Sequence, residues 1–168
     1  MDGGPRWLSE GEQRAWRAYL AMTRLLSAQL DRQLQRDSGM PMAYYVILVL
    51  LSETPGRSLR MSELAEASDS SRSRLSHAVA RLEETGWVRR ETCDTDRRGA
   101  FAVLTDEGFA ALAEAAPGHV AEVRRFLIDA LEPEQVRQLE EICGRVVERL
   151  RVDQPDRSAA PMAVERAG

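Results

Sequence analysis

The stretch LSHAVARLEETGWVRRETCDTDRRGAFAVLTDEG, residues 75–108, decides the fold of this chain. It begins with the spacing of an amphipathic helix, which Gly86 ends. Two strand-like runs follow, residues 87–92 and 100–104, around a long polar tip at residues 94–99. A new helix start comes directly after the second run. This order predicts a recognition helix followed by a β-wing, which together form the DNA-reading half of a winged helix-turn-helix.

A second helix is predicted just upstream of the recognition helix. Residues 61–67 form this short helix, with Ser62 as its N-cap, and a polar turn at residues 68–71 follows it. In the recognition helix, Leu75, Val79 and Leu82 share one face, and the opposite face is small and hydrogen-bonding, as a DNA groove requires. The candidate DNA-contacting residues of this helix are Ser71, Arg72, Ser73, Arg74, Ser76, His77 and Arg81. The alternative interpretation is that some of them form only a solvated helix face.

Two arginines, Arg97 and Arg98, occupy the tip of the predicted wing, with Asp96 beside them. Arginine inserted into a narrow minor groove responds to the shape of DNA rather than to base identity. We therefore expect at least one of the two to contact the minor groove and Asp96 to orient it. The plainer alternatives are solvated loop charges for the arginines and a turn-forming role for Asp96.

The total charge gives little support to a nucleic-acid partner, because the chain has a net charge of −4. The charge is unevenly placed, however: residues 70–99 contain seven arginines and five acids, a surplus of +2. All 23 basic residues are arginine, so each can form a planar bidentate fork. With so small a surplus, DNA binding has to depend on where the arginines point rather than on bulk electrostatics.

Long amphipathic helices are predicted at both ends of the chain, around a central apolar helix at residues 42–52. The predicted fold is mainly α with a small β-wing. Its expected divisions are a flexible N-terminus at 1–8, a dimerisation helix at 9–40, a winged helix-turn-helix lobe at 41–105, further dimerisation helices at 106–151 and a disordered tail at 152–168. The terminal helices have more apolar surface than the lobe can cover, which predicts a homodimer.

Several function classes find no support in the sequence. It contains no glycine-rich phosphate loop and no G-x-S-x-G or H-E-x-x-H motif, so no catalytic residue is predicted and the protein is not expected to be an enzyme. His77 and His119 stand apart from any cluster of metal ligands, so neither a metal nor another cofactor is expected. Because there is no membrane-length apolar run and no secretory signal, we expect a cytoplasmic protein without a membrane partner.

The two cysteines, Cys93 and Cys143, are far apart and do not suggest a disulfide framework. Cys143 lies on an apolar helical stripe, where packing is its expected role. Cys93 follows two arginines, whose charge favours the reactive thiolate. A thiol-based, redox-responsive regulator that uses Cys93 is therefore one alternative function.

In these motifs the chain resembles the MarR family of bacterial transcriptional regulators, over residues 16–151. The segments that carry the resemblance are LEETGWVRR at 82–90, D-x-DRR at 94–98, LT-x-x-G at 104–108, PMAYYVIL at 41–48 and MSELA at 61–65. The resemblance implies a dimer formed by the terminal helices, with the helix at 71–85 in the major groove. It also implies that Arg98 enters the minor groove while Asp96 holds its guanidinium. His77 and Ser76, where many members carry Arg and Thr, depart from the family pattern, as does Thr95 in place of a frequent Pro.

The resemblance further implies a ligand pocket between the dimer interface and the DNA-binding lobe. Tyr44 and Tyr45 are the candidates to line it, although at least one of them is expected in the core. The sequence thus predicts a homodimeric, sequence-specific regulator that binds a pseudo-palindromic operator on double-stranded DNA, most simply a repressor released by a small-molecule effector. The second alternative is a winged-helix protein-interaction module without specific DNA binding.

Overall fold

The computed structural model describes residues 5–93 and 96–152, and for residues 93 and 96–99 it describes the main chain. The predictions about residues 1–4, 94, 95 and 153–168, which include most of the proposed tail, lie outside the described residues. Within the described part, the fold is mainly helical with one three-stranded antiparallel sheet. The predicted fold class is confirmed.

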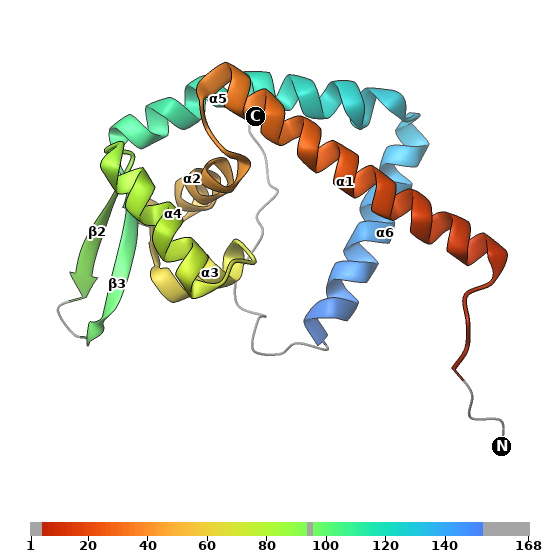
Figure 1. Ribbon diagram of the computed structural model, residues 1–168, viewed down its shortest axis with the longest axis horizontal. Helices are drawn as coiled ribbons and strands as arrows, with labels where there is room; N and C mark the ends of the chain where they lie inside the picture. Colours follow the sequence, from red (N-terminus) through yellow and green to blue (C-terminus); the bar gives the residue numbers. More distant parts are fainter. Residues whose placement is uncertain (1–4, 94–95, 153–168) are drawn as a thin grey trace.

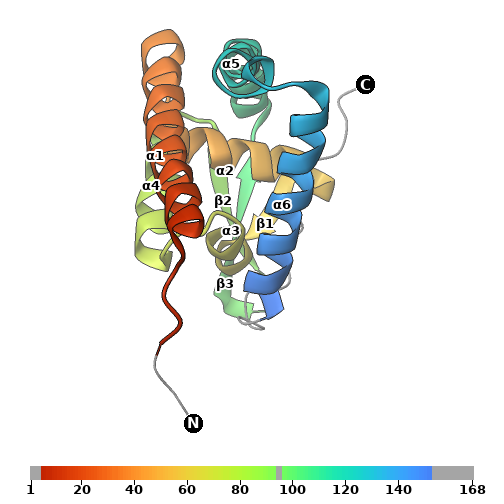
Figure 2. The same cartoon turned by 90° about the vertical axis from the view of Figure 1, so that its right-hand side faces the viewer.

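Two long helices, α1 (Glu10–Ser38) and α5 (Asp106–Phe126), run across the top of the molecule in Figure 1. They pack together, and Gln29 Nε2 of α1 donates a hydrogen bond of 2.6 Å to Glu122 Oε1 of α5. A short 3₁₀ turn, η2 (Ile128–Ala130), leads to α6 (Pro133–Val152). Figures 1 and 2 show α6 descending on the side of the molecule away from the sheet.

The start of α2 (Met42–Glu53) is fixed by a residue of α1. Pro41 provides no side-chain cap, and the main-chain N–H of Met42 instead donates to Asp31 Oδ1 at 2.9 Å. This contact satisfies one of the N–H groups that every helix start leaves unpaired. α2 is the buried central helix that its apolar sequence predicts. Its buried residues are Tyr45, Ile47, Leu48 and Leu51.

The first strand, β1 (Ser58–Arg60), is absent from the sequence predictions and follows the 3₁₀ turn η1 (Pro55–Arg57). β1 pairs antiparallel with β3 (Asp96–Leu104), with Ser58 opposite Val103 and Arg60 opposite Phe101. A three-residue strand has too few residues to show an alternating pattern, and its partner lies about forty residues later in the chain. Only the tertiary fold brings the two together.

The short helix α3 (Met61–Ala67) begins where β1 ends, and its N-cap is Arg60, so the prediction of Ser62 as N-cap is wrong. The chain passes from strand to helix without a connecting loop, which moves the helix start ahead of Ser62. Glu63 compensates for the missing serine or aspartate cap, because its Oε2 accepts a hydrogen bond of 3.3 Å from the Arg60 main-chain N–H.

The wing consists of β2 (Val88–Cys93) and β3, in a sheet of strand order β1-β3-β2. Val88 pairs with Leu104 and Thr92 with Ala100, and the register then shifts so that Cys93 pairs with Asp96. The predicted long tip at residues 94–99 is therefore wrong, because residues 96–99 belong to β3. The register shift absorbs the extra residues of β3 and lets the ladder continue towards the tip.

The LT-x-x-G motif joins the base of the wing to α5. Thr105 Oγ1 donates to Gly86 O (2.7 Å), and the same oxygen accepts a hydrogen bond of 3.0 Å from the Gly108 main-chain N–H. Gly108 packs so closely that a Cβ atom there would lie 2.1 Å from Trp87 O. Leu104 is buried in the core beneath the motif. Each residue of the motif thus has a physical reason for its identity.

The core lies where α2, α3 and the recognition helix α4 (Arg72–Glu84) meet the sheet. The predicted stripe of α4, formed by Leu75, Val79 and Leu82, is buried there. Gly86 ends α4 with a positive φ of 77°, and Trp87 N donates back to Leu82 O at 3.0 Å. This arrangement is a Schellman cap, in which glycine avoids the strain that a Cβ would cause.

Candidate nucleic-acid interface

The recognition helix α4 presents a polar, exposed face opposite its buried stripe. Ser71 is its N-cap, and the Ser71 hydroxyl accepts a hydrogen bond of 3.3 Å from the Arg74 main-chain N–H. The other six candidate residues of this helix are all exposed. They are Arg72, Ser73, Arg74, Ser76, His77 and Arg81. The structure therefore brings the predicted set together on one surface, with Ser71 at its N-terminal end.

The arginines of this region differ in whether an acidic side chain of the same chain pairs with them. Arg81 forms an ion pair of 2.6 Å with Glu84 on the same helix, and this hydrogen bond raises the pKa of Arg81. Arg89 is paired in the same way with Glu91 on its own strand, at 2.8 Å. Within the described residues, neither Arg72 nor Arg74 has such a partner. These two are the arginines of α4 whose guanidinium groups are available to a ligand.

Arg90 of β2 connects the wing to the recognition helix. Its Nη2 donates to the main-chain oxygen of Ser76 at 2.8 Å, and its Nε lies 3.2 Å from Glu83 Oε2. Glu83 also accepts a hydrogen bond of 3.0 Å from the Arg90 main-chain N–H. Both side chains are about one-third exposed, at 34% and 32%. In the sequence Arg90 contributes to the positive charge of the region and to the LEETGWVRR motif, whereas in the structure it also bonds the wing to α4.

The wing-tip candidates Asp96, Arg97 and Arg98 belong to β3, and their side chains lie outside the described residues, as does that of Cys93. The main chain places them at the end of the hairpin that is remote from α5 (Figure 1). Minor-groove contact by the arginines, orientation by Asp96 and redox chemistry at Cys93 stay predictions.

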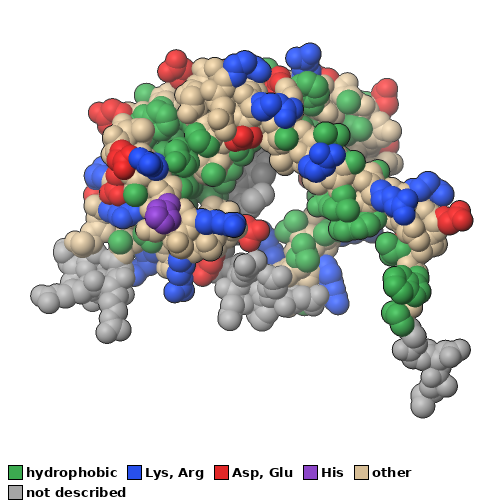
Figure 3. All heavy atoms as spheres, viewed as in Figure 1, with side chains coloured by type: hydrophobic (Ala, Val, Ile, Leu, Met, Phe, Trp, Pro, Cys, Tyr) green, Lys and Arg blue, Asp and Glu red, His purple; other side chains and the backbone are tan. Residues whose placement is uncertain are grey.

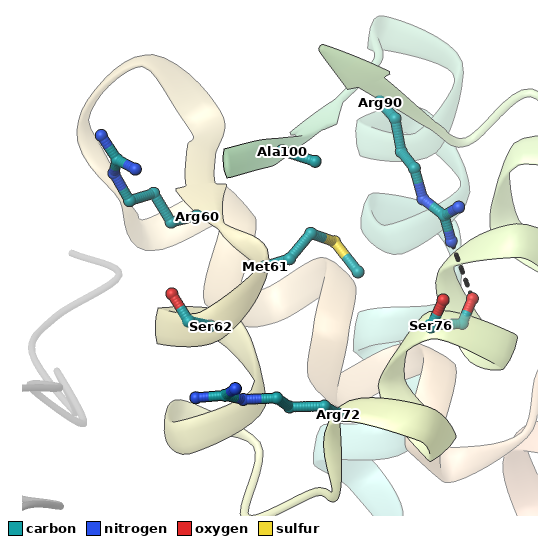
Figure 4. A pocket seen from close by; sticks show the side chains of 7 residues that line it. All are labelled: Arg60, Met61, Ser62, Arg72, Ser76, Arg90 and Ala100. Carbon is teal, nitrogen blue, oxygen red and sulfur yellow. Dashed lines mark hydrogen bonds between the residues drawn. The ribbon is translucent and has the colours of Figure 1, made fainter. Parts of the chain in front are cut away.

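A cavity of about 380 Å³ lies between the recognition helix, the wing and the start of α3. Its lining residues are Arg60, Met61, Ser62, Arg72, Ser76, Arg90 and Ala100. Figure 4 shows Arg72 extending from α4 towards the first turn of α3, and Arg90 reaching from the wing to Ser76. Of these residues, the sequence predicts a DNA contact only for Arg72 and Ser76. The others come from separate segments whose proximity depends on the pairing of β1 with β3.

The two tyrosines of α2 have different surroundings. Tyr45 is buried in the core, and its ring lies 4.5 Å, centroid to centroid, from that of His119 in α5. Burial raises the pKa of Tyr45 and lowers the pKa of His119. Tyr44 is half-buried at the edge of the core. The expectation that at least one tyrosine is a core residue is confirmed, and a ligand-binding role for Tyr44 stays a prediction.

A second cavity, of about 400 Å³, lies between the end of α1, Trp87 and α5. Gln33 lines it although this side chain is only 2% exposed, and its Oε1 has no hydrogen-bond partner in the described part of the chain. Gln33 Nε2 donates to Asp37 Oδ2 at 3.0 Å. One signal in the sequence points to Gln33: it is a polar residue next to Leu34 and close to Leu30 on the apolar stripe of α1.

Other kinds of site are absent from the part of the chain that the structure describes. There, no three His, Cys, Asp or Glu side chains gather in a way that could hold a metal ion. Nor is any helix of residues 5–93 and 96–152 both long and apolar enough to cross a membrane.

Comparisons with known proteins agree with this geometry. The sequence profile of the MarR family matches residues 38–99. The structure is similar to that of Sco3205, a MarR family transcriptional regulator from Streptomyces coelicolor solved in complex with DNA. The two chains are 57% identical with a TM-score of 0.82, over 87% of this chain and 92% of Sco3205. AbsC, a MarR family transcriptional regulator from the same organism, is 49% identical with a TM-score of 0.81, over 88% of this chain and 99% of AbsC.

A sequence relative from another organism gives the same result. The HTH-type transcriptional regulator PecS of Dickeya dadantii is 28% identical over 126 residues, which is 75% of each chain. All of these relatives are transcriptional regulators, and none is named as an enzyme. With an identity of 57% over almost the full length of a solved member, this chain belongs to the MarR family of transcriptional regulators.

Proposed function

We propose that this regulator is a homodimer that binds a pseudo-palindromic site on double-stranded DNA, with α4 in the major groove and the wing at the adjacent minor groove. The observation that carries the proposal is the exposed face of α4, which lies beside the wing. The six exposed candidate residues on this face carry hydroxyl, imidazole and guanidinium groups, and none of the six is apolar. Hydroxyls and guanidinium groups are the donors that contact phosphates and base edges. The crystal structure of Sco3205 with DNA supports the same partner.

The need for a second subunit follows from α6. This helix of 20 residues has no buried residue in the single chain, yet Ile142, Val146 and Leu150 follow one another along one face. An isolated helix is only marginally stable in water, and an exposed apolar stripe is unfavourable. α1 has the same excess, with Trp16, Tyr19, Leu20 and Leu25 each at least 45% exposed. Figure 3 shows apolar side chains gathered over α1 and over α6.

A second copy is the partner that covers both helices at once. In a two-fold symmetric dimer the same surfaces meet on each side, and the two α4 helices are related by the same axis. Such a dimer fits a palindromic site with half-sites about one helical turn, roughly 34 Å, apart.

Binding at a promoter would exclude polymerase, so repression is the simplest outcome. A small-molecule effector would release the repressor by favouring a dimer whose α4 helices no longer match this spacing.

The dimer is tested by changing one side chain on each face of α6. We expect Val146→Arg, on the apolar stripe, to produce monomers in analytical ultracentrifugation and to abolish specific DNA binding. Glu148→Arg introduces the same side chain on the opposite face and should leave the dimer intact. A monomeric wild-type protein, or two variants with the same oligomeric state, would contradict the proposal.

DNA binding is tested by selecting bound duplexes from random-sequence DNA, followed by gel-shift titration with the selected duplex. We expect a palindromic consensus, and a loss of affinity for many duplexes with Arg98→Ala, because a wing-tip arginine reads shape. If Arg98→Ala leaves both the affinity and its salt dependence unchanged, the wing-tip assignment is wrong.

One structural observation favours the protein-interaction module as a second candidate. Three of the arginines near the interface, Arg81, Arg89 and Arg90, are already paired with carboxylates, so the available positive charge is smaller than the sequence suggests. If the wild-type dimer binds no duplex specifically at moderate salt, this second candidate replaces the first.

A further inference from the structure

The cavity of about 400 Å³ between the end of α1, Trp87 and α5 contains polar groups that the proposed DNA interface does not use. Its volume is in the range of pockets that take small organic ligands. Figure 1 shows the last turns of α1 beside α5, at the top of the lobe. Tyr44 and Tyr45, the candidates for the ligand pocket that the family resemblance implies, are not among its lining residues. It is therefore a separate candidate for a binding site.

A buried amide oxygen in this cavity lacks a partner. Gln33 is 2% exposed, and its Oε1 accepts no hydrogen bond in the described part of the chain. Its amide is held in this orientation, because Nε2 donates to Asp37 Oδ2 at 3.0 Å and a reversed amide would place Oε1 against that carboxylate. A buried acceptor without a partner is unfavourable, so the cavity favours a ligand that brings a hydrogen-bond donor.

The lining of the cavity is also negative in charge. Its acidic residues are Asp37 and Glu114, and none of the described residues that line it is basic. Arg36, which is not a lining residue, pairs with Asp37 at 2.8 Å and offsets its charge. Glu114 has no ion pair within the described residues. It lies one turn of α5 before Gly118, where an added Cβ would lie 3.1 Å from Gln33 Nε2. The free carboxylate and the amide oxygen therefore favour a cation that donates hydrogen bonds.

The rest of the lining is mostly apolar. Met40 and Ala115 are buried, and Trp87 contributes an aromatic side chain. Such a surface packs against an aromatic or hydrocarbon group, and an indole ring also attracts a nearby cation. The lining as a whole matches a compound with one ammonium group and one apolar part.

We propose that this cavity binds a small aromatic amine in its ammonium form, whose N–H groups donate to Gln33 Oε1 and to the Glu114 carboxylate. The ligand contacts α1 and α5, which belong to the dimerisation region, and Trp87, which lies between the recognition helix and the wing. Its binding favours one arrangement of the lobe relative to these helices, and we expect it to lower the affinity for DNA. This effect on DNA rests on the proposed function, for which it names the chemical class of the effector.

The first experiment measures the binding of three probes to the wild-type protein by isothermal titration calorimetry. The probes are phenethylamine, phenethyl alcohol and phenylpropionate, which share a phenyl group on a short chain and carry a cationic, a neutral and an anionic head group. We expect saturable binding of phenethylamine, and binding of the other two that is weaker by at least about tenfold. Equal affinities for the three probes, or heats that do not saturate with phenethylamine, would overturn the inference.

Variants then locate the bound amine. Glu114→Gln removes the charge with little change in shape, and Gln33→Met removes the acceptor; each should weaken phenethylamine binding by about tenfold. Glu107→Gln, in the exposed first turn of α5 and outside the cavity, removes the same charge and should keep the wild-type affinity. Thermal unfolding without ligand checks that each variant is folded. Equal affinities of Glu114→Gln and Glu107→Gln would overturn the inference, because the amine would then respond only to the net charge of −4.

The second experiment titrates the selected duplex in gel shifts with and without saturating phenethylamine. We expect the amine to weaken DNA binding of the wild type by about fivefold or more, and that of Glu114→Gln by much less. An amine that binds the wild type without changing its affinity for DNA would overturn the effector role. A wild-type protein that binds no duplex would overturn the proposed function, whereas saturable binding of phenethylamine that depends on Glu114 would still support the cavity as an amine site.

Discussion

Arg90 in β2 donates a hydrogen bond of 2.8 Å to the main-chain oxygen of Ser76 in α4, which fastens the wing to the recognition helix. The same guanidinium pairs with Glu83, about two turns further along α4 than Ser76. In the proposed complex α4 and the wing enter neighbouring grooves of one duplex, which requires a rigid connection between the two elements. Arg90 provides such a connection within a single chain.

We expect Arg90→Ala to lower the free energy of unfolding by about 1–2 kcal/mol, because it removes a half-buried ion pair and a bond to a main-chain oxygen. The control is Arg89→Ala, whose partner Glu91 lies on the same exposed strand; its effect should stay within about 0.5 kcal/mol. Urea denaturation of the dimer measures both. Equal decreases in the free energy of unfolding in the two variants would show that the Arg90 contacts stabilise the fold no more than an exposed ion pair does.

The LT-x-x-G motif gives a prediction in which the same substitution has opposite effects at two sites. At Gly108 an added Cβ would lie 2.1 Å from Trp87 O, and we expect Gly108→Ala to destabilise the fold by about 3 kcal/mol, since backbone has to move. At Gly144, within α6, no atom lies within 4 Å of an added Cβ. Gly144→Ala should stabilise the protein by up to about 1 kcal/mol through helix propensity. Thermal unfolding of both variants tests this difference in sign.

The half-buried imidazole of His119 predicts a loss of stability in mild acid. Burial lowers the pKa of His119 in the folded protein, and its Nδ1 has no hydrogen-bond partner among the described residues. The unfolded chain, with a pKa of about 6.5, then takes up a proton that the folded chain resists. The stabilising contribution is therefore complete above the unfolded pKa and is lost as the pH falls through the folded pKa.

The measurement is the unfolding temperature of the wild type at about pH 7.5 and about pH 5.5, on either side of the unfolded value. We expect a drop in acid that is smaller in His119→Phe, because phenylalanine fills the space against Tyr45 without titrating. His77→Gln, at the exposed histidine of α4, should keep the wild-type drop. A drop of the same size in His119→Phe and the wild type would contradict this explanation.

The partners of the α4 arginines predict a ranking of their effects on DNA affinity. Arg81 is held by Glu84, whereas Arg74 has no ion pair or hydrogen bond from its side chain within the described residues. We expect Arg74→Ala to weaken binding of the selected duplex by about 1–3 kcal/mol and Arg81→Ala by clearly less. Gel-shift titration at a fixed salt concentration compares them. The reverse order would mean that Arg81 exchanges Glu84 for DNA.

Local signals in the sequence predicted the helices and the ends of most of them. At the start of α1, Ser9 and Glu12 have the S-x-x-E spacing of a capping box, and Ser9 N donates to Glu12 Oε2 at 2.7 Å. Gly86 ends the recognition helix, and Thr105 caps α5 by accepting from Gly108 N. These features depend on residues at most a few positions apart, which is why a periodic pattern and a cap are sufficient to find them.

The exposed face of α4 was equally predictable, because a helix that buries Leu75, Val79 and Leu82 has to turn its other residues outward. Which of its arginines are available was not predictable. The pairing of Arg81 with Glu84 depends on rotamers, and the attachment of Arg90 to Ser76 depends on how the wing folds back. Charge counting treats all of these arginines alike.

The sequence by itself determined the order of the elements, the buried stripe of each helix and the family to which the chain belongs. Those follow from periodicity and short motifs, whose physics is local. The tertiary structure alone decided that β1 forms the edge of the sheet, that α3 begins at its end, and that Arg60, Arg72 and Arg90 surround one cavity. The reason is that pairing β1 with β3 joins segments about forty residues apart, and no local preference encodes such a contact. The sheet brings Arg60 to the rim of this cavity, with its guanidinium over the ring of Phe101 in β3.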